Sequence, residues 1–269
     1  MPLIILKDSL ERLYRKYNRR EFVHPDPLEF LYHYEGLRDR EIVAFVASSL
    51  AYGRVAYILK SVSFVLERMV PTPSEFLKRT SLKTMNQTFS GFRHRFTSDQ
   101  KLCAMLFGVK KVLERHGSLK ACFSAGLSDG DDTILPALSA FTKELTDCAD
   151  DNLEHSVPSP TKGSACKRLN LFLRWMVRSD EVDPGGWENV PASMLIVPVD
   201  THMHKICHLL GLTARKHADM CTAKEITKAF RNIAPADPVR YDFSLTRLGI
   251  RKDADIAAFV KQFRRLSIS

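Results

Sequence analysis

The sequence predicts an all-helical protein. Apolar residues recur at intervals of three and four along most of the 269-residue chain, which is the spacing of one face of an α-helix. Helix-start signals precede several of these segments, and no segment alternates between apolar and polar residues as a half-buried strand does. The composition, 45% hydrophobic and 26% charged, is typical of a globular chain whose length accommodates one large domain or two small lobes.

The first predicted helix is amphipathic and covers residues 3–17. Its charged residues avoid a single apolar stripe, which consists of Leu3, Leu6, Leu10, Leu13 and Tyr17. A proline-rich break follows. Within it, Asp26 and Pro27 predict the start of a short helix over 28–34.

A central buried helix is predicted over residues 42–52. Asp39 is the expected N-cap, and small residues such as Ala44 and Ala47 allow other helices to pack closely against it. Gly53 interrupts the pattern, and helical spacing resumes over 55–70 until two prolines end it.

The rest of the chain continues as helices. Patterns over 75–127 are weaker and include a helix over 102–115 that ends at Gly117 as a C-cap. The helix over 167–178 is expected to bury one face and to turn Arg168, Trp175 and Arg178 away from it. Further helices are predicted over 201–210, over 222–234, after Asp237-Pro238, and over 254–266.

Charge is unevenly distributed along the chain. The formal net charge is +9, yet residues 129–154 hold eight acidic residues and one basic residue. The other 243 residues hold 39 basic and 23 acidic residues, a net charge of +16, which favours an anionic partner such as nucleic acid. The segment 128–163, which contains two turn-forming stretches, is therefore interpreted as an exposed acidic insertion that faces away from the binding cleft.

Several classes of protein are excluded by the sequence. No apolar run approaches the roughly 20 residues of a membrane span, and the N-terminus lacks the layout of a secretory signal. The six cysteines stand singly, which indicates reduced thiols and argues against an iron-sulfur cluster. We expect a cytoplasmic monomer without a cofactor or bound metal.

One pair of segments suggests chemistry. Gly163-Ser164-Ala165-Cys166-Lys167-Arg168 is followed, 33 positions after Lys167, by Asp200 within Val197-Pro198-Val199-Asp200. This arrangement resembles the helix-hairpin-helix DNA glycosylase superfamily, and its interval is most similar to that of archaeal 8-oxoguanine DNA glycosylase. Taken whole, the chain also looks like an uncharacterised bacterial family placed near these glycosylases.

The resemblance implies a fold and a reaction. It implies that residues 1–269 form a single glycosylase-like unit of two helical lobes with an active cleft between them. It also implies base excision repair, in which Asp200 is catalytic and Lys167 is the nucleophile of an AP lyase. The substrate would be double-stranded DNA that contains a damaged base, an oxidised purine such as 8-oxoguanine.

Elementary chemistry is compatible with these roles. A lysine attacks a sugar carbon only as the uncharged amine, which nearby positive charge favours, and Lys167 stands beside Arg168 in the first turn of its predicted helix. Cleavage of a glycosidic bond develops positive charge on the sugar, which the Asp200 carboxylate would stabilise.

Residues for binding DNA are expected around this pair. A flipped base needs an aromatic or apolar pocket, for which the candidates are Phe172, Trp175, Trp187 and Tyr241. The helix ending in Ala51-Tyr52-Gly53-Arg54 resembles the superfamily helix whose following loop enters DNA, where the family usually carries Gln or Asn. Tyr52 or Arg54 would fill the vacated stack. The remaining predicted DNA contacts come from Lys162, Gly163, Ser164, Arg168, His202 and His204.

Two alternatives stay open. The first is a catalytically silent DNA-binding protein with a glycosylase-like fold, which the unusual residues at 51–52 suggest. The second is a metal-dependent hydrolase, because Asp200, His202, His204, Cys207 and His208 fall within nine positions and two of the histidines share a helical face. Lys205 directly after His204 opposes a metal site, because its charge would repel the ion.

Overall fold

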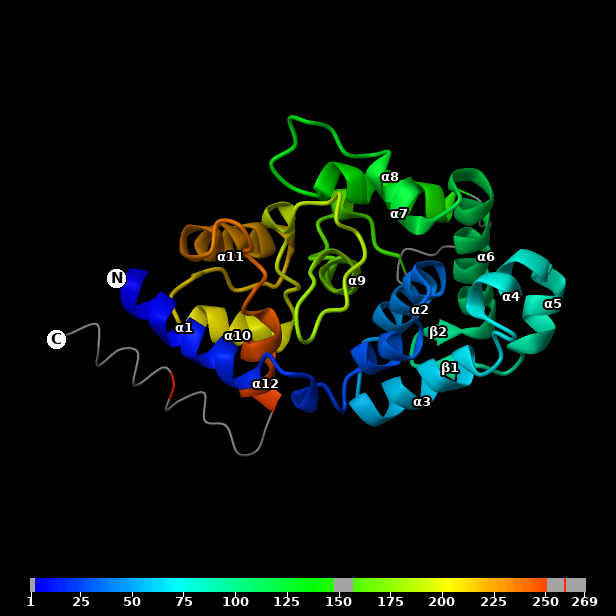
Figure 1. Cartoon of the computed structure of the whole chain (residues 1–269), viewed down its shortest axis with the longest axis horizontal. Helices are drawn as coiled ribbons and strands as arrows, with labels where there is room; N and C mark the ends of the chain where they lie inside the picture. The colour runs from blue at the N-terminus through cyan, green and yellow to red at the C-terminus, as the bar shows by residue number, and fades with distance from the viewer. Residues whose placement is uncertain (1–2, 148–156, 251–258, 260–269) are drawn as a thin grey trace.

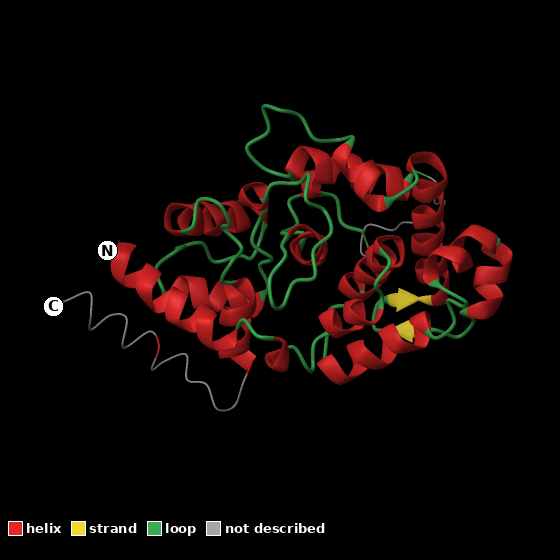
Figure 2. Cartoon of the chain, viewed as in Figure 1, coloured by secondary structure: helices red, strands yellow, loops and turns green. Residues whose placement is uncertain are grey.

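The structure is a computed structural model that describes residues 3–147, 157–250 and 259. The prediction of an all-helical chain is confirmed in its main feature (Figure 2). The α-helices are α1 (Leu3–Tyr17), α2 (Leu37–Ser49), α3 (Val55–Leu66), α4 (Pro73–Arg79), α5 (Leu82–Thr88), α6 (Asp99–His116), α7 (Leu119–Ser124), α8 (Leu135–Thr146), α9 (Lys167–Val177), α10 (Thr201–Leu209), α11 (Met220–Ile233) and α12 (Asp242–Ile250). Short 3-10 helices cover Arg20–Phe22, Pro27–His33, Pro160–Lys162 and Ala192–Met194, and two short strands are β1 (Arg93–His94) and β2 (Thr97–Ser98).

The helices form two groups with α9 between them (Figure 1). One group contains α1, α10, α11 and α12, and α12 packs against both α1 and α10. The other contains α2 to α8, where α6 packs against α5, α7 and α8. Helix α9 makes its most extensive contact with α2, so its position depends chiefly on α2.

Several element boundaries follow from single residues, as predicted. Asp26 caps the helix at Pro27–His33 by accepting a hydrogen bond from the Leu28 backbone N–H at 3.0 Å. Gly53 and Gly117 separate helices with φ values of +97° and +81°, a left-handed conformation that favours glycine. Asp200 caps α10.

Two predicted helix starts are wrong. Helix α2 begins at Leu37 with Gly36 as its N-cap, and Asp39 lies in the first turn, where its Oδ1 accepts a hydrogen bond from the Ser74 N–H of α4 at 2.7 Å. Residues after Asp237-Pro238 form turns, and α12 begins only at Asp242. The predicted helix over 254–266 lies outside the described residues except for Phe259.

A small antiparallel hairpin was not predicted. Strand β1 pairs with β2 in the register Arg93 with Ser98 and His94 with Thr97, leaving Arg95 and Phe96 at the turn. Strands of two residues are too short to show an alternating pattern in the sequence.

After its first two residues, helix α9 is buried on all sides, so the predicted exposed face is wrong at Trp175 and Arg178. Trp175 is fully buried, and Arg174 and Arg178 are also buried because carboxylates meet them inside the protein. Asp183 accepts hydrogen bonds from both guanidinium groups, and Asp242 accepts one from Arg174 Nη1 at 2.5 Å. The outer carboxylates of this network are Asp180 and Asp237, which pair with Arg178.

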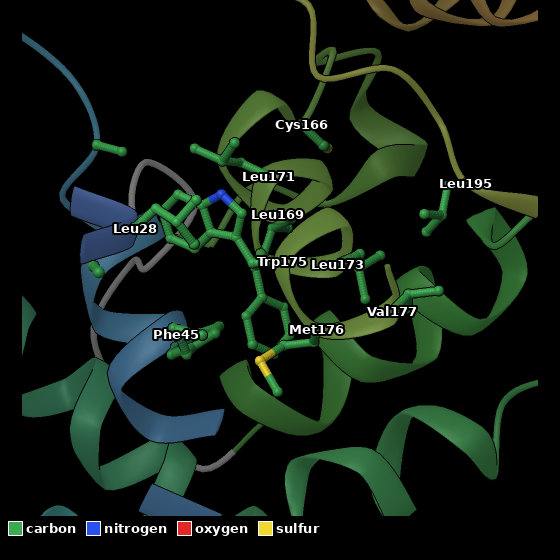
Figure 3. Packing of buried hydrophobic residues seen from close by; sticks show 14 of the residues in the cluster. Leu28, Phe45, Cys166, Leu169, Leu171, Leu173, Trp175, Met176, Val177 and Leu195 are labelled. Atoms are coloured by element: carbon green, nitrogen blue, oxygen red, sulfur yellow. The ribbon is translucent and has the colours of Figure 1, made fainter. Parts of the chain in front are cut away.

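The residues of α9 are part of one continuous hydrophobic core, and Figure 3 shows them together with Phe45 of α2. Phe172 of α9 meets Phe45 of α2 edge-on with ring centroids 5.6 Å apart, and it stacks on Phe141 of α8 at 6.1 Å. Trp187 packs edge-on against Phe172 at 5.2 Å. Its indole Nε1 donates a hydrogen bond to buried Glu41 at 2.8 Å.

The segment 128–163 is not an exposed insertion over its whole length. Helix α8 lies within it and buries Ala137, Leu138, Phe141 and Leu145 against α6 and α7. The acidic residues between 148 and 156 lie outside the described residues. The acidic turn at 128–132 leads directly into this well-packed helix, so acidity in the sequence did not indicate exposure of the neighbouring residues.

No helix within the described residues combines the length and apolarity needed to cross a membrane. Cys103, Cys122, Cys166 and Cys207 are free and buried, and Cys221 is free and exposed, as expected for reduced thiols.

Candidate active site

Lys167 and Asp200 face each other in the structure. The Lys167 Nζ lies 3.9 Å from Asp200 Oδ2, and it donates a hydrogen bond to the Ala51 carbonyl oxygen at 3.3 Å. Both side chains are about one-third exposed, with exposed fractions of 28% and 35%. An amine and a carboxylate that are 33 positions apart in sequence are therefore in reach of one small molecule or one nucleotide.

Asp200 is positioned by the start of α10. Its Oδ1 accepts hydrogen bonds from the backbone N–H groups of His202 and Met203, each at 2.9 Å. The preceding segment is fixed by a hydrogen bond from the Val197 N–H to Thr227 Oγ1 at 3.0 Å. One carboxylate oxygen thus caps the helix, and the other, Oδ2, faces Lys167.

Lys167 is positioned by the start of α9. Cys166, the N-cap residue, has a φ of +47° and makes no side-chain cap, so the first N–H groups of α9 receive no capping side chain. The loop before it is tied to α11 by a hydrogen bond from the Met220 N–H to the Gly163 carbonyl oxygen at 3.0 Å. An uncapped start of an 11-residue helix attracts anions through its partial positive charge.

A cavity of about 600 Å³ lies in front of the pair. It is lined by Pro158, Ser159, Lys162, Gly163, Ser164, Ala165, Cys166, Lys167, Arg168, Val199, Asp200, Ala218 and Asp219. Four of the predicted DNA contacts are therefore brought together with Lys167 and Asp200, namely Lys162, Gly163, Ser164 and Arg168. The end of the 128–163 segment lines the cavity, so the expectation that it faces away is wrong.

The cavity walls contain three cationic side chains and two carboxylates. Hydrogen bonds from the Thr222 N–H and hydroxyl, together with Arg215, lower the pKa of Asp219. Burial raises the pKa of the Cys166 thiol to about 11, so this thiol is protonated at neutral pH and does not compete as a nucleophile.

The Tyr52 side chain is engaged in contacts within the protein, whereas the Arg54 side chain is exposed. The Tyr52 hydroxyl lies 2.8 Å from the His94 carbonyl oxygen and 2.7 Å from Thr97 Oγ1, and the Arg168 guanidinium lies 4.9 Å from the centroid of its ring. Tyr52 is therefore a bridge between α9 and the hairpin, and its role as a DNA contact stays a prediction. Arg54 is exposed at the start of α3.

The four aromatic residues predicted to receive a base are elsewhere. Phe172, Trp175 and Trp187 are fully buried and Tyr241 is 1% exposed, and none of them lines the cavity. They build the core because each packs against apolar neighbours, and Tyr241 also donates a hydrogen bond to Glu11 at 2.7 Å. Among the described residues that line the cavity, none is aromatic.

The histidines after Asp200 do not line the cavity. His202 is exposed, and His204 Nε2 lies 2.8 Å from the Arg215 carbonyl oxygen. The rings of His204 and His208 are 6.3 Å apart, and within the described ranges no three His, Cys, Asp or Glu side chains gather in a group that would hold a metal ion.

A second carboxylate next to the site was missed by the sequence analysis. Asp242 is buried in contact with Arg174. Burial raises its pKa, Arg174 opposes the shift, and the charges of Asp200 and Lys167 act on it as well. The buried ion pairs of α9 therefore interact electrostatically with the Lys167–Asp200 pair.

Comparison with known proteins gives one match. A family model described as "Protein of unknown function (DUF2400)" matches residues 26–251, which include α2 to α12 and the cavity. Neither a curated protein nor a solved structure matches the chain.

Proposed function

Because the chain belongs to the family described as protein of unknown function (DUF2400), we propose its function from the site itself: excision of a damaged base from double-stranded DNA by Lys167 and Asp200. The observation that carries the proposal is the 3.9 Å separation of Lys167 Nζ and Asp200 Oδ2 at a cavity with basic walls. The proposed fold type is that of the helix-hairpin-helix glycosylases, in which a Pro-Val-Asp segment opens the helix beside the cleft.

The cavity is of a suitable size and charge for one nucleotide. Its volume of about 600 Å³ lies within the range of small-molecule sites. The uncapped start of α9 and the side chains of Lys162 and Arg168 would hold the phosphates. Since no aromatic ring lines the cavity, an everted base would contact the apolar side chains of Val199 and Ala218 instead.

In the proposed reaction Lys167 is the nucleophile, and Asp200 stabilises positive charge and accepts a proton. The uncharged Lys167 amine forms a bond to the sugar C1′ as the bond from C1′ to the base breaks, and the electron pair leaves with the base. The base gains a proton from solvent, while Asp200 Oδ2 stabilises the positive charge on the sugar and accepts a proton from Lys167 Nζ. The C1′–O4′ bond then breaks, O4′ takes the proton held by Asp200, and C1′ becomes an iminium carbon bonded to Lys167 Nζ. Loss of a C2′ proton to solvent and departure of the 3′-phosphate, as the C3′–O bond breaks, cleave the DNA strand. The substrate that the resemblance favours is an oxidised purine such as 8-oxoguanine.

Borohydride trapping tests the proposal. The protein is incubated with a duplex that contains one 8-oxoguanine, or one abasic site, and borohydride reduces any imine to a stable adduct. We expect an adduct with the natural protein and none with Lys167→Gln. Lys143→Gln, an exposed lysine on α8, should form the adduct normally.

Asp200→Asn separates the reaction from folding. Asparagine caps helices as well as aspartate does, so stability should change little while base release falls by two orders of magnitude or more, roughly the value of one electrostatic group at a reacting centre. An adduct that survives Lys167→Gln, or base release by Asp200→Asn at the natural rate, would overturn the proposal. Tight binding of DNA without release of any lesion base would favour the silent DNA-binding alternative.

A further inference from the structure

The tip of the hairpin presents an aromatic ring to solvent. Phe96, at the turn between β1 and β2, is 61% exposed, and Tyr57 on the adjacent helix α3 is 62% exposed. Large aromatic side chains are usually buried, so two exposed rings on neighbouring elements are informative.

The hairpin is anchored firmly behind this tip. His94 is 3% exposed, and its ring lies 2.9 Å from Ser61 Oγ through Nδ1 and 3.0 Å from the Tyr52 carbonyl oxygen through Nε2. Thr97 is buried on the opposite strand. Because the inward residues of both strands are fixed, the outward position of Phe96 is a property of the fold.

The turn itself is held in an unfavourable conformation. Arg95 has a φ of +52°, which costs a non-glycine residue free energy, and its guanidinium lies 5.5 Å from the centroid of the Phe96 ring. The Arg95 side chain covers Gly53, where an added Cβ would lie 2.9 Å from Arg95 Cδ. A cation and a ring are thus held side by side at the tip.

Residues 51–53 connect this tip to the Lys167 site. The Ala51 carbonyl oxygen accepts a hydrogen bond from Lys167, Tyr52 contacts both Arg168 and the hairpin, and Gly53 contacts Arg95. In Figure 1 the hairpin lies beside α2 and α3, on the side of α2 away from α10 to α12. One strand of DNA that occupies the cavity would continue toward it.

The surroundings of the tip are basic. Arg93 and Arg95 of the hairpin and Arg54 and Lys60 at the start and on the surface of α3 are exposed. Exposed rings among cations are the combination with which proteins bind unpaired nucleic-acid strands, because bases stack on the rings and phosphates contact the cations. A membrane surface would require a broader apolar area than two separate rings among these four cations.

We propose that the hairpin tip binds DNA with an unpaired base, which stacks on Phe96 while Arg54, Arg93 and Arg95 contact the phosphates. This inference rests on the proposed action on DNA and extends it, since it assigns a second contact beyond the cavity. Tyr57 would stack on a neighbouring base or sugar of the same strand.

Binding to lesion-free DNA tests the inference without requiring base release. The probe is a duplex with a single 2-aminopurine in a one-nucleotide bulge, which is unpaired without an abasic site, and its fluorescence is quenched when the base stacks on a ring. We expect quenching by the natural protein and by Phe96→Trp, and binding that is roughly 5- to 100-fold weaker with Phe96→Ala. Ile4→Ala removes an apolar side chain that is 75% exposed on α1 and should bind as the natural protein does.

Several results would overturn the inference. It fails if Phe96→Ala, with an unchanged melting temperature, binds and quenches as well as Ile4→Ala does. It also fails if Phe96→Ala loses binding only to vesicles that contain phosphatidylserine, because the tip would then recognise a membrane. If the adduct on Lys167 is absent but Phe96→Ala weakens DNA binding, the proposed reaction is wrong and the assigned surface stands.

Discussion

Replacing Arg174 with Met is expected to destabilise the protein by about 3–5 kcal/mol, the cost of removing one partner from a buried ion pair. The Arg174 side chain is 4% exposed and lies between two buried carboxylates. Its Nη1 donates to Asp242 at 2.5 Å, and its Nε and Nη2 donate to Asp183 at 3.2 and 3.0 Å. Met fills a similar volume, so the measured loss reports chiefly the unpaired charge.

The Arg174→Met substitution affects Asp183 and Asp242 differently. Asp183 keeps its hydrogen bond from Arg178, whereas Asp242 loses the guanidinium that opposes the burial-induced rise of its pKa. In the variant, the pKa of Asp242 is therefore higher in the folded than in the unfolded protein. Such a group contributes stability below its unfolded pKa and loses it as the pH rises, so the deficit of Arg174→Met should be larger at pH 7 than near pH 4.

Urea denaturation followed by circular dichroism measures the effect, and a thermal melt should show a midpoint lowered by about 6–10 °C for a chain of this size. Arg79→Met is the control, because Arg79 is 71% exposed in its pair with Glu75 and should cost less than about 1 kcal/mol. The double variant Arg174→Met with Asp242→Asn should recover part of the loss. The reasoning is refuted if Arg174→Met costs no more than Arg79→Met, or if Asp242→Asn restores nothing.

Two further predictions concern the contacts that hold the helices together. Burial tends to raise the pKa of Glu11, but hydrogen bonds from Arg240 and Tyr241 leave it lowered, so Glu11 contributes stability at neutral pH that is lost as the pH falls through the lowered value. We expect Glu11→Gln to lower the urea midpoint at pH 7 and to match the natural protein well below pH ~4, and equal midpoints at pH 7 would contradict this. Gly108→Ala should cost about 1–3 kcal/mol in the same assay, because its Cβ would lie 2.2 Å from the Leu145 carbonyl oxygen where α6 meets α8. Gly130→Ala, which meets nothing within 4 Å, should cost little, and an equal loss for the two alanines would argue against tight packing at Gly108.

Periodicity and capping predicted most helices because these signals are local. The stripe over 3–17 gave helix α1 with matching limits, and the αL glycine at 117 ended α6 where expected. The same local reasoning failed at Asp39, whose carboxylate meets the Ser74 N–H 35 positions away. An aspartate three residues before an apolar run caps that helix in some proteins, but here it accepts a hydrogen bond from another helix.

The burial of α9 could not be predicted from the periodicity of the sequence. Arginines at 174 and 178 look like an exposed helix face, and they become core residues only because Asp183 and Asp242 meet them. Asp242 is 68 positions from Arg174, a separation that no helical period encodes. The burial of Trp187 was not predicted for the same reason, because its indole N–H donates a hydrogen bond to Glu41, which lies 146 positions away.

The structure shows that part of the net positive charge is buried and paired. The +16 that favours nucleic acid includes Arg174 and Arg178, which are buried, paired with four carboxylates and unable to face a phosphate. The exposed cations nearest the hairpin tip are Arg54, Arg93 and Arg95, and this surface meets the Lys167 cavity at Ala51. Exposed charges that are separated by more than a Debye length, about 8 Å at physiological salt, contribute little to one another. Attraction of DNA therefore depends on where the exposed cations lie on the surface and not on the net charge of the whole chain.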